Sequence, residues 1–303
     1  MINELKIKLR AAEIRATQLA VADSYANQMM RCPVHLSIGQ EYWLPLIKHF
    51  KTSNDRFFSS HRSHSLYLAL SNDVDSYFSE LFGLSDGVTK GKGGSMHLKS
   101  LENGLEASIP IVGSSIGIAL GSALSHKIIS KDNSRTISYF GDGACEEGIL
   151  HESLNMASIY QLPLLFICEN NLYSCNTHIQ NRQTSENMAR FADAHNIQNE
   201  QISQEECLEK IISKFEKAFE ISKSMPYFLE IKSYRLYEHC GHKKDVKNGD
   251  RTGTEYEKFL NKDIVSKWIE ENKSINEAFN YTYKKSVDIC NKLAELSFNL
   301  KNI

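Results

Sequence analysis

The sequence predicts an α/β fold, built on a parallel sheet with helices on both faces. Three apolar segments, 135–140, 163–168 and 227–231, have the composition of strands, and helix-like segments separate them at 144–161 and 205–222. Strands that alternate with helices are typical of parallel sheets, whose strands are buried on both faces and therefore almost wholly apolar. Such sheets bind ligands in the loops at the carboxyl ends of their strands.

The remaining elements follow in chain order. Apolar residues recur at about helical spacing over 3–30, which predicts a long N-terminal helix. Residues 42–50 are expected to form a short helix, and 57–62 a short strand that runs into a histidine-rich turn. The segment 254–303 is expected to form a helical C-terminal extension. Because no repeat, low-complexity run or proline-rich stretch marks a linker, we predict a single domain over residues 1–303.

The composition excludes several classes of protein. Hydrophobic residues make up 41% of the chain and charged residues 24%, a balance that argues against disorder. The net charge is −2 and no basic block is present, so nucleic-acid binding is not expected. The sequence has neither a long apolar run nor the apolar core of a signal peptide. We therefore expect a cytoplasmic protein without membrane contact and, since its seven cysteines form no CxxC pair, with reduced thiols.

Polar turns follow two of the predicted strands. Asp142 lies between two glycines after the first strand, and Asn171 follows the second strand 29 positions later. Either turn alone is consistent with a simple loop, but this spacing places a carboxylate and an amide oxygen at neighbouring strand ends. Such oxygens suit Mg²⁺, and the glycines let the main chain approach a diphosphate. The glycine spacing fits neither a dinucleotide fingerprint nor a P-loop.

These two turns, at 141–143 and 169–173, resemble the signature of thiamine-diphosphate enzymes. The further motifs lie at 35–41, 91–97, 111–113 and 151–157. Together they resemble the alpha subunit of thiamine-diphosphate-dependent 2-oxo acid dehydrogenases, the group of the pyruvate, branched-chain and acetoin enzymes. The resemblance runs from about His35 to Thr252, and it implies the thiamine-diphosphate-binding fold.

The resemblance implies two cofactors, thiamine diphosphate and Mg²⁺. The metal would be bound by the Asp142 carboxylate, the Asn171 side chain and the main-chain carbonyl of Tyr173. Main-chain groups of Gly143 and Ala144 would face the diphosphate.

The resemblance also assigns roles to an arginine and several histidines. Arg62 would contact the phosphates through a charge-assisted hydrogen bond, and His242 would do so from a mobile loop. His64 and His35 would be catalytic, lining the channel to the reactive carbon of the cofactor. The main chain around Val112 would meet the aminopyrimidine ring.

Three positions depart from the pattern of the family. His61, which we also expect at the cofactor, stands where the family has tyrosine. Pro110 replaces the usual glycine, and Lys243 replaces a serine. We expect these changes to leave diphosphate binding intact, whereas the identity of the substrate does not follow from the sequence.

The implied function is that of an alpha subunit that decarboxylates a 2-oxo acid, or cleaves an acyloin, and passes the acyl unit to an acceptor such as a lipoyl group. Two alternatives stay open: a carboligase subunit that uses an aldehyde or sugar as acceptor, and a non-catalytic assembly subunit. The resemblance implies a beta subunit that supplies the activating glutamate, in an assembly of two alpha and two beta chains. A lipoyl acyltransferase would be the further partner of a lipoyl-dependent enzyme.

Overall fold

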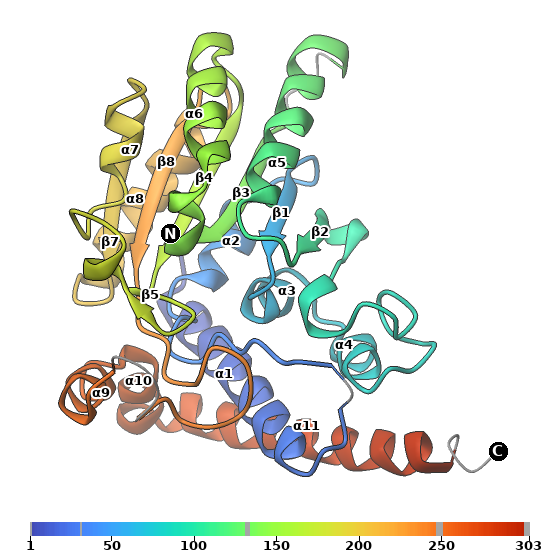
Figure 1. Ribbon diagram of the computed structural model, residues 1–303. Coiled ribbons are helices and arrows are strands. Elements are labelled where there is room, and N and C mark those ends of the chain that lie inside the picture. The colour runs from blue at the N-terminus through green and yellow to red at the C-terminus, as the bar shows by residue number, and fades with distance from the viewer. Residues whose placement is uncertain (1, 31, 131–133, 247–250, 300–303) are drawn as a thin grey trace.

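A six-stranded parallel sheet forms the centre of the computed structural model, which describes residues 2–30, 32–130, 134–246 and 251–299 (Figure 1). The strand order is β2-β1-β3-β4-β8-β7, and every neighbouring pair is parallel. The strands are β1 (Arg56–Ser60), β2 (Leu105–Ile109), β3 (Thr136–Gly141), β4 (Leu164–Asn170), β7 (Gln198–Ser203) and β8 (Tyr227–Lys232). The predicted α/β class is confirmed.

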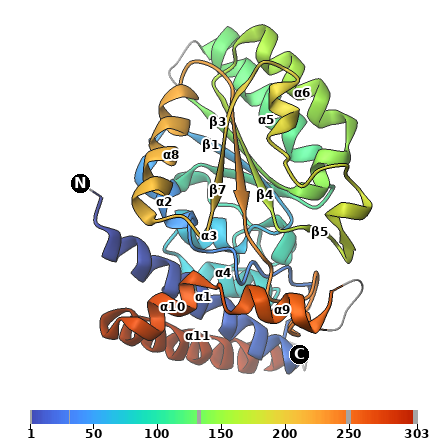
Figure 2. The ribbon, with the colours of Figure 1, turned by 90° about the vertical axis from the view of Figure 1, so that its left-hand side faces the viewer.

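Helices cover both faces of this sheet, as Figure 2 shows. One face carries α2 (Leu44–Phe50) and α8 (Leu208–Ile221), and the other carries α5 (Ser114–Ser125) and α6 (Gly148–Tyr160). β4 is buried along its whole length between these two layers. Its sequence is apolar because helices cover both of its faces.

Helices from the two ends of the chain pack together below the sheet (Figure 2). They are α1 (Glu4–Ala26), α9 (Gly253–Leu260), α10 (Ile264–Glu271) and α11 (Lys273–Asn299). Arg15 of α1 connects them to the body of the domain. Its buried guanidinium lies 2.7 Å from the Glu41 carboxylate and 2.7 Å from the Asp263 carboxylate at the start of α10. One arginine therefore joins α1, α10 and the loop that follows His35.

The structure differs from the predicted elements in a few places. The helix expected over 144–161 is divided into a 3₁₀ turn, Asp142–Glu146, and α6. The edge strands β2 and β7 and the helix α5 were not predicted, because β7 is polar and β2 is short. The remaining elements are short: α3 (His64–Leu70), α4 (Val74–Leu81), α7 (Arg190–Asp193) and the hairpin β5 (Tyr173–Ser174) with β6 (Thr177–His178).

Two expectations from composition can be compared with the structure. Among the described residues, no helix is long and apolar enough to span a bilayer. All seven cysteines are free thiols in the structure. The prediction of a single domain over 1–303 stays a prediction.

Candidate active site

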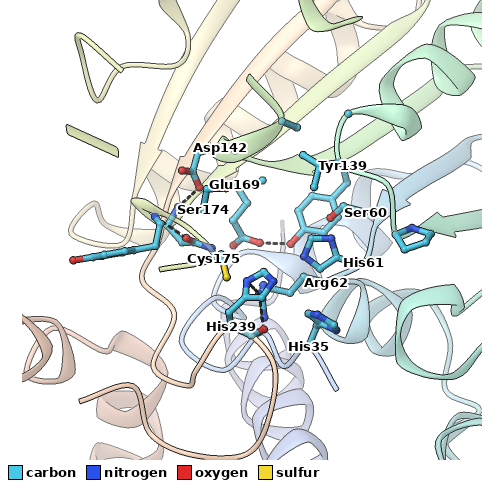
Figure 3. Close-up of a pocket in the computed structure, with 18 of the residues that line it drawn as sticks. His35, Ser60, His61, Arg62, Tyr139, Asp142, Glu169, Ser174, Cys175 and His239 are labelled. Carbon is cyan, nitrogen blue, oxygen red and sulfur yellow. Dashed lines mark hydrogen bonds between the residues drawn. The ribbon is translucent and has the colours of Figure 1, made fainter. Parts of the chain in front are cut away.

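A cavity of about 260 Å³ opens at the carboxyl ends of β1, β3 and β4 (Figure 3). The predicted site residues that line it come from separate parts of the chain: His35, His61, Arg62, Val112, Asp142, Gly143, Ala144, Asn171 and Tyr173. Nine of the eleven residues expected at the site are thus brought together. The other two, His64 and His242, do not line this cavity.

Asp142, Asn171 and Tyr173 form the side of the cavity that follows β3 and β4. The Asn171 main-chain N–H lies 3.4 Å from the Asp142 carboxylate, and the Tyr173 N–H donates to the Asn171 side-chain oxygen at 3.1 Å. Gly143 allows the main chain to pass close by, because a Cβ there would lie 2.6 Å from the Ser174 hydroxyl oxygen. The three predicted metal ligands therefore occupy one compact corner.

Three histidines form the opposite side, and we call His35, His61 and His239 the histidine cluster (Figure 3). Their ring centroids are 4.9 to 5.5 Å apart. Burial and the charge of Arg62 lower their pKa values, to about 4 for His35, about 3 for His61 and about 2 for His239. All three imidazoles are therefore neutral at pH 7 and can both donate and accept hydrogen bonds.

Arg62 holds the loop that carries His239. Its guanidinium donates to the main-chain oxygen of Leu36 at 2.8 Å and to that of His239 at 3.0 Å. Burial and Arg235 lower the pKa of Arg62 to about 9, so it keeps its charge at neutral pH. In this arrangement the side chain contacts two carbonyl groups and, at 3.1 Å, the His239 Nδ1 atom, and the phosphate contact expected of it stays a prediction.

His64 lies behind the cavity, which differs from the expectation. It begins α3 with its ring in the core, where Nδ1 is 2.6 Å from the Tyr77 hydroxyl and Nε2 is 2.6 Å from the Ser95 hydroxyl. The Ser95 oxygen also accepts from the main-chain N–H of His35 at 3.0 Å. His64 is therefore connected to the cavity through Ser95 and His35.

His242 also lies elsewhere than expected. Its ring packs against Tyr25 near the end of α1, with 5.7 Å between the ring centroids. The cause is Gly241, which has a φ of +130° and whose N–H donates to the Val34 carbonyl. The chain turns there, so His239 is the histidine of this loop that reaches the cavity. The glycine match assigns the phosphate contact to His242, and that contact stays a prediction.

Glu169 and Tyr139 line the cavity but were not predicted as site residues. The Glu169 carboxylate accepts hydrogen bonds from the Tyr139 hydroxyl and, at 3.1 Å, from the Trp43 indole (Figure 3). Burial raises the pKa of Glu169 to about 7. A carboxylic acid at the end of an apolar strand is the available signal in the sequence, but a polar turn that follows a strand has the same appearance.

Replacing Glu169 with glutamine should flatten the pH dependence of stability. Since its pKa is about 7 in the folded chain and ordinarily 4.5, the folded chain binds more protons between these values. The free energy of unfolding of the wild type should therefore fall by about 3 kcal/mol from pH 4.5 to pH 7 on account of this group. Urea denaturation across this range should show a shallower slope for Glu169→Gln. Glu106→Gln, which changes a half-buried carboxylate paired with Arg56, is the control, and parallel curves for Glu169→Gln and wild type would refute the shift.

The chain is similar in sequence to known proteins of one family. The family described as dehydrogenase E1 component matches residues 10–287. The alpha subunit of acetoin:2,6-dichlorophenolindophenol oxidoreductase from Bacillus subtilis is 31% identical over 286 residues, which are 94% of this chain and 81% of that one. The alpha subunit of the pyruvate dehydrogenase E1 component from Rickettsia bellii is 30% identical over 271 residues, 88% of this chain and 82% of that one.

A solved structure supports the fold alone. Transketolase from Leishmania mexicana superposes with a TM-score of 0.58 at 16% sequence identity over 95% of this chain. The chain spans about half of that protein, 48% of its length. The fold, the relatives and the family match over most of the chain agree with the motifs described above. This chain belongs to the dehydrogenase E1 component family, as the motifs predicted.

Proposed function

We propose that this chain is the alpha subunit of a thiamine-diphosphate-dependent enzyme that decarboxylates a 2-oxo acid, or cleaves an acyloin, and passes the acyl unit to an acceptor such as a lipoyl group. The proposal rests on one observation. Asp142, Asn171 and Tyr173 line the same cavity as the histidine cluster, in a chain of the E1 family. When bound, thiamine diphosphate supplies the nucleophilic carbon and accepts the electron pair left when CO₂ departs.

The corner formed by Asp142, Asn171 and Tyr173 suits a metal and a diphosphate. One carboxylate, one amide oxygen and one main-chain carbonyl are hard oxygen donors of the kind Mg²⁺ prefers. The Asp142 carboxylate lies in this corner almost fully buried, at 1% side-chain exposure. Gly143 and Ala144 offer main-chain groups beside it. These residues would hold Mg²⁺ and, through it, the diphosphate.

The histidine cluster suits the substrate end. Neutral imidazoles can donate hydrogen bonds to the oxygens of an oxo acid, and they can take up or deliver a proton. The charge of Arg62 behind them favours a carboxylate in the cavity. His35 and His239 would orient the substrate, and His61 gives this site a third imidazole where the family pattern has a tyrosine.

Exposed apolar residues at the rim of the cavity are an argument for a partner chain. Ile111 and Val112 stand beside it with 66% and 42% of their surface exposed, which is unusual for large apolar side chains next to a reactive site. A covering beta subunit would bury them, exclude water and bring the activating glutamate, in an assembly of two alpha and two beta chains. A lipoyl acyltransferase as further partner, and the cytoplasm as location, belong to the same proposal.

The test is exchange of the C2 proton of thiamine diphosphate, followed by NMR with the full chain alone and with its co-expressed partner. We expect slow exchange by the chain alone, rapid exchange by the complex, and CO₂ release by the complex from one or more members of a 2-oxo acid panel. Rapid exchange by the chain alone would contradict the two-chain site and would direct attention to Glu169, a carboxylate in this cavity. A complex that binds the cofactor without any turnover would instead indicate an assembly subunit.

A further inference from the structure

The carboxylate expected to bind the metal is already paired with a guanidinium. Arg182 lies directly after the 3₁₀ turn Ile179–Asn181, and its Nη2 donates to the Asp142 carboxylate at 2.6 Å. Its Nη1 donates to Glu146, and its Nε donates to the Thr177 carbonyl at 3.0 Å. The Arg182 side chain is 9% exposed and that of Asp142 is 1% exposed. The guanidinium is thus fixed on three sides, behind the wall of the cavity.

This pairing differs from that of the other arginine at the site. Arg62 donates to main-chain carbonyls, which are neutral, so its contacts do not depend on a metal. Arg182 donates to one oxygen of the Asp142 carboxylate, Oδ2, so the guanidinium and a cation bound to Asp142 would share one carboxylate. A divalent cation placed on this carboxylate would stand within a few ångströms of the guanidinium, where repulsion between like charges is strong because water is largely excluded.

We propose that Arg182 is a positioning residue of the metal–diphosphate site that orients the Asp142 carboxylate and competes with the metal for it. The inference rests on the proposed function, because it takes Asp142 as the metal ligand. A cation alone has to displace the guanidinium or bear its repulsion. A diphosphate adds negative charge that offsets both positive groups, and Glu146 remains as a partner for Arg182.

The consequence is that metal and diphosphate bind cooperatively. If the diphosphate raises the affinity for the metal by some factor, the metal raises the affinity for the diphosphate by the same factor. In this structure Arg182 contributes to the cooperativity, because its charge weakens the binding of the metal in the absence of the anion. Removing the charge should strengthen binding of the metal alone and reduce the cooperativity.

The experiment titrates Mn²⁺, detected by electron paramagnetic resonance, into the full-length chain with and without inorganic diphosphate. For Arg182→Gln we expect Mn²⁺ alone to bind about tenfold more tightly than in wild type, which is the effect of one charge-assisted hydrogen bond. We also expect diphosphate to raise the Mn²⁺ affinity less in this variant than in wild type. Arg182→Lys keeps the charge and should stay close to wild type. Arg56→Gln removes a charge from the surface pair with Glu106 and is the matched control.

The outcomes separate this inference from the proposed function. Equal Mn²⁺ affinity in wild type, Arg182→Gln and Arg56→Gln would overturn the inference and leave the metal site standing. Tight binding by Arg182→Lys as well as Arg182→Gln would also overturn it, because charge would then not be the cause. If Asp142→Ala binds Mn²⁺ as well as wild type does, both the inference and the metal assignment fail. Circular dichroism of each variant establishes that its fold is intact.

Discussion

Turnover by the complex should fall about 10²–10⁴-fold when His35 is replaced with alanine, the usual contribution of a positioned proton-transfer group. His35 lines the cavity with a neutral ring, and no metal or phosphate contact is assigned to it. Affinity for thiamine diphosphate should therefore change little. Steady-state kinetics on the best 2-oxo acid, together with calorimetry of cofactor binding, would separate the two effects.

Two further variants sharpen this expectation. His64→Ala should lower turnover less than His35→Ala does, since His64 acts on His35 through Ser95, and it should also lower the thermal midpoint because its ring is fully buried. His195→Ala is the matched control, because His195 lies outside the cavity beside His151. Normal turnover with weakened cofactor binding in His35→Ala would show that His35 holds the cofactor rather than the substrate.

Replacing Arg15 with alanine should destabilise the chain by about 3–5 kcal/mol, the cost of leaving a buried charge without its partner. Both Glu41 and Asp263 would be stranded, at 0% and 4% side-chain exposure. The free energy of unfolding from urea denaturation would measure the loss. Lys8→Ala, which breaks a half-buried i,i+4 pair with Glu4 on the surface of α1, should change it by no more than about 0.5 kcal/mol.

A rescue variant tests the cause of this loss. If the effect comes from stranded carboxylates, neutralising them with Glu41→Gln and Asp263→Asn in the Arg15→Ala background should restore part of the stability. No recovery would indicate that the lost packing of the arginine side chain is the cause. Because Glu41 also accepts from the Gly39 N–H, the wild-type pair fixes the loop that follows His35.

The sequence predicted the parts of the site that local chemistry determines. Asp142 and Asn171 follow buried apolar strands, and parallel neighbours bring such positions to one edge, so their meeting could be inferred. β7 could not be inferred, because its almost wholly polar sequence reflects a place at the sheet edge that only the assembled fold defines. Glu169 was missed for a related reason: its role depends on Tyr139 and Trp43, which lie 30 and 126 positions away.

The orientations of the histidines also could not be predicted from the sequence. His239 and His242 are three positions apart, and which of them reaches the cavity depends on the main-chain direction at Gly241. His64 matched its motif, but its ring direction follows from its place at the start of α3. Motif spacing therefore identified the loops that reach the cavity, whereas the side chains that face it were decided by dihedral angles and packing that the sequence does not display.

The bond between Arg62 and the main-chain oxygen of His239 has a consequence for how this site can change. Every amino acid has that oxygen, so this bond to the domain is kept when side chains of the loop are exchanged, while a change of His239 removes only the second contact of Arg62, with Nδ1 at 3.1 Å. Residues 239, 240, 242 and 243 can thus be randomised in a library while the loop stays in register over the cavity, provided that Gly241 is kept for its φ of +130° and Glu238 for its bond to the Lys243 N–H. Variants with new substrate preferences should be found there more often than among substitutions of Arg62, since the arginine secures the loop and the neighbouring side chains determine what it accepts.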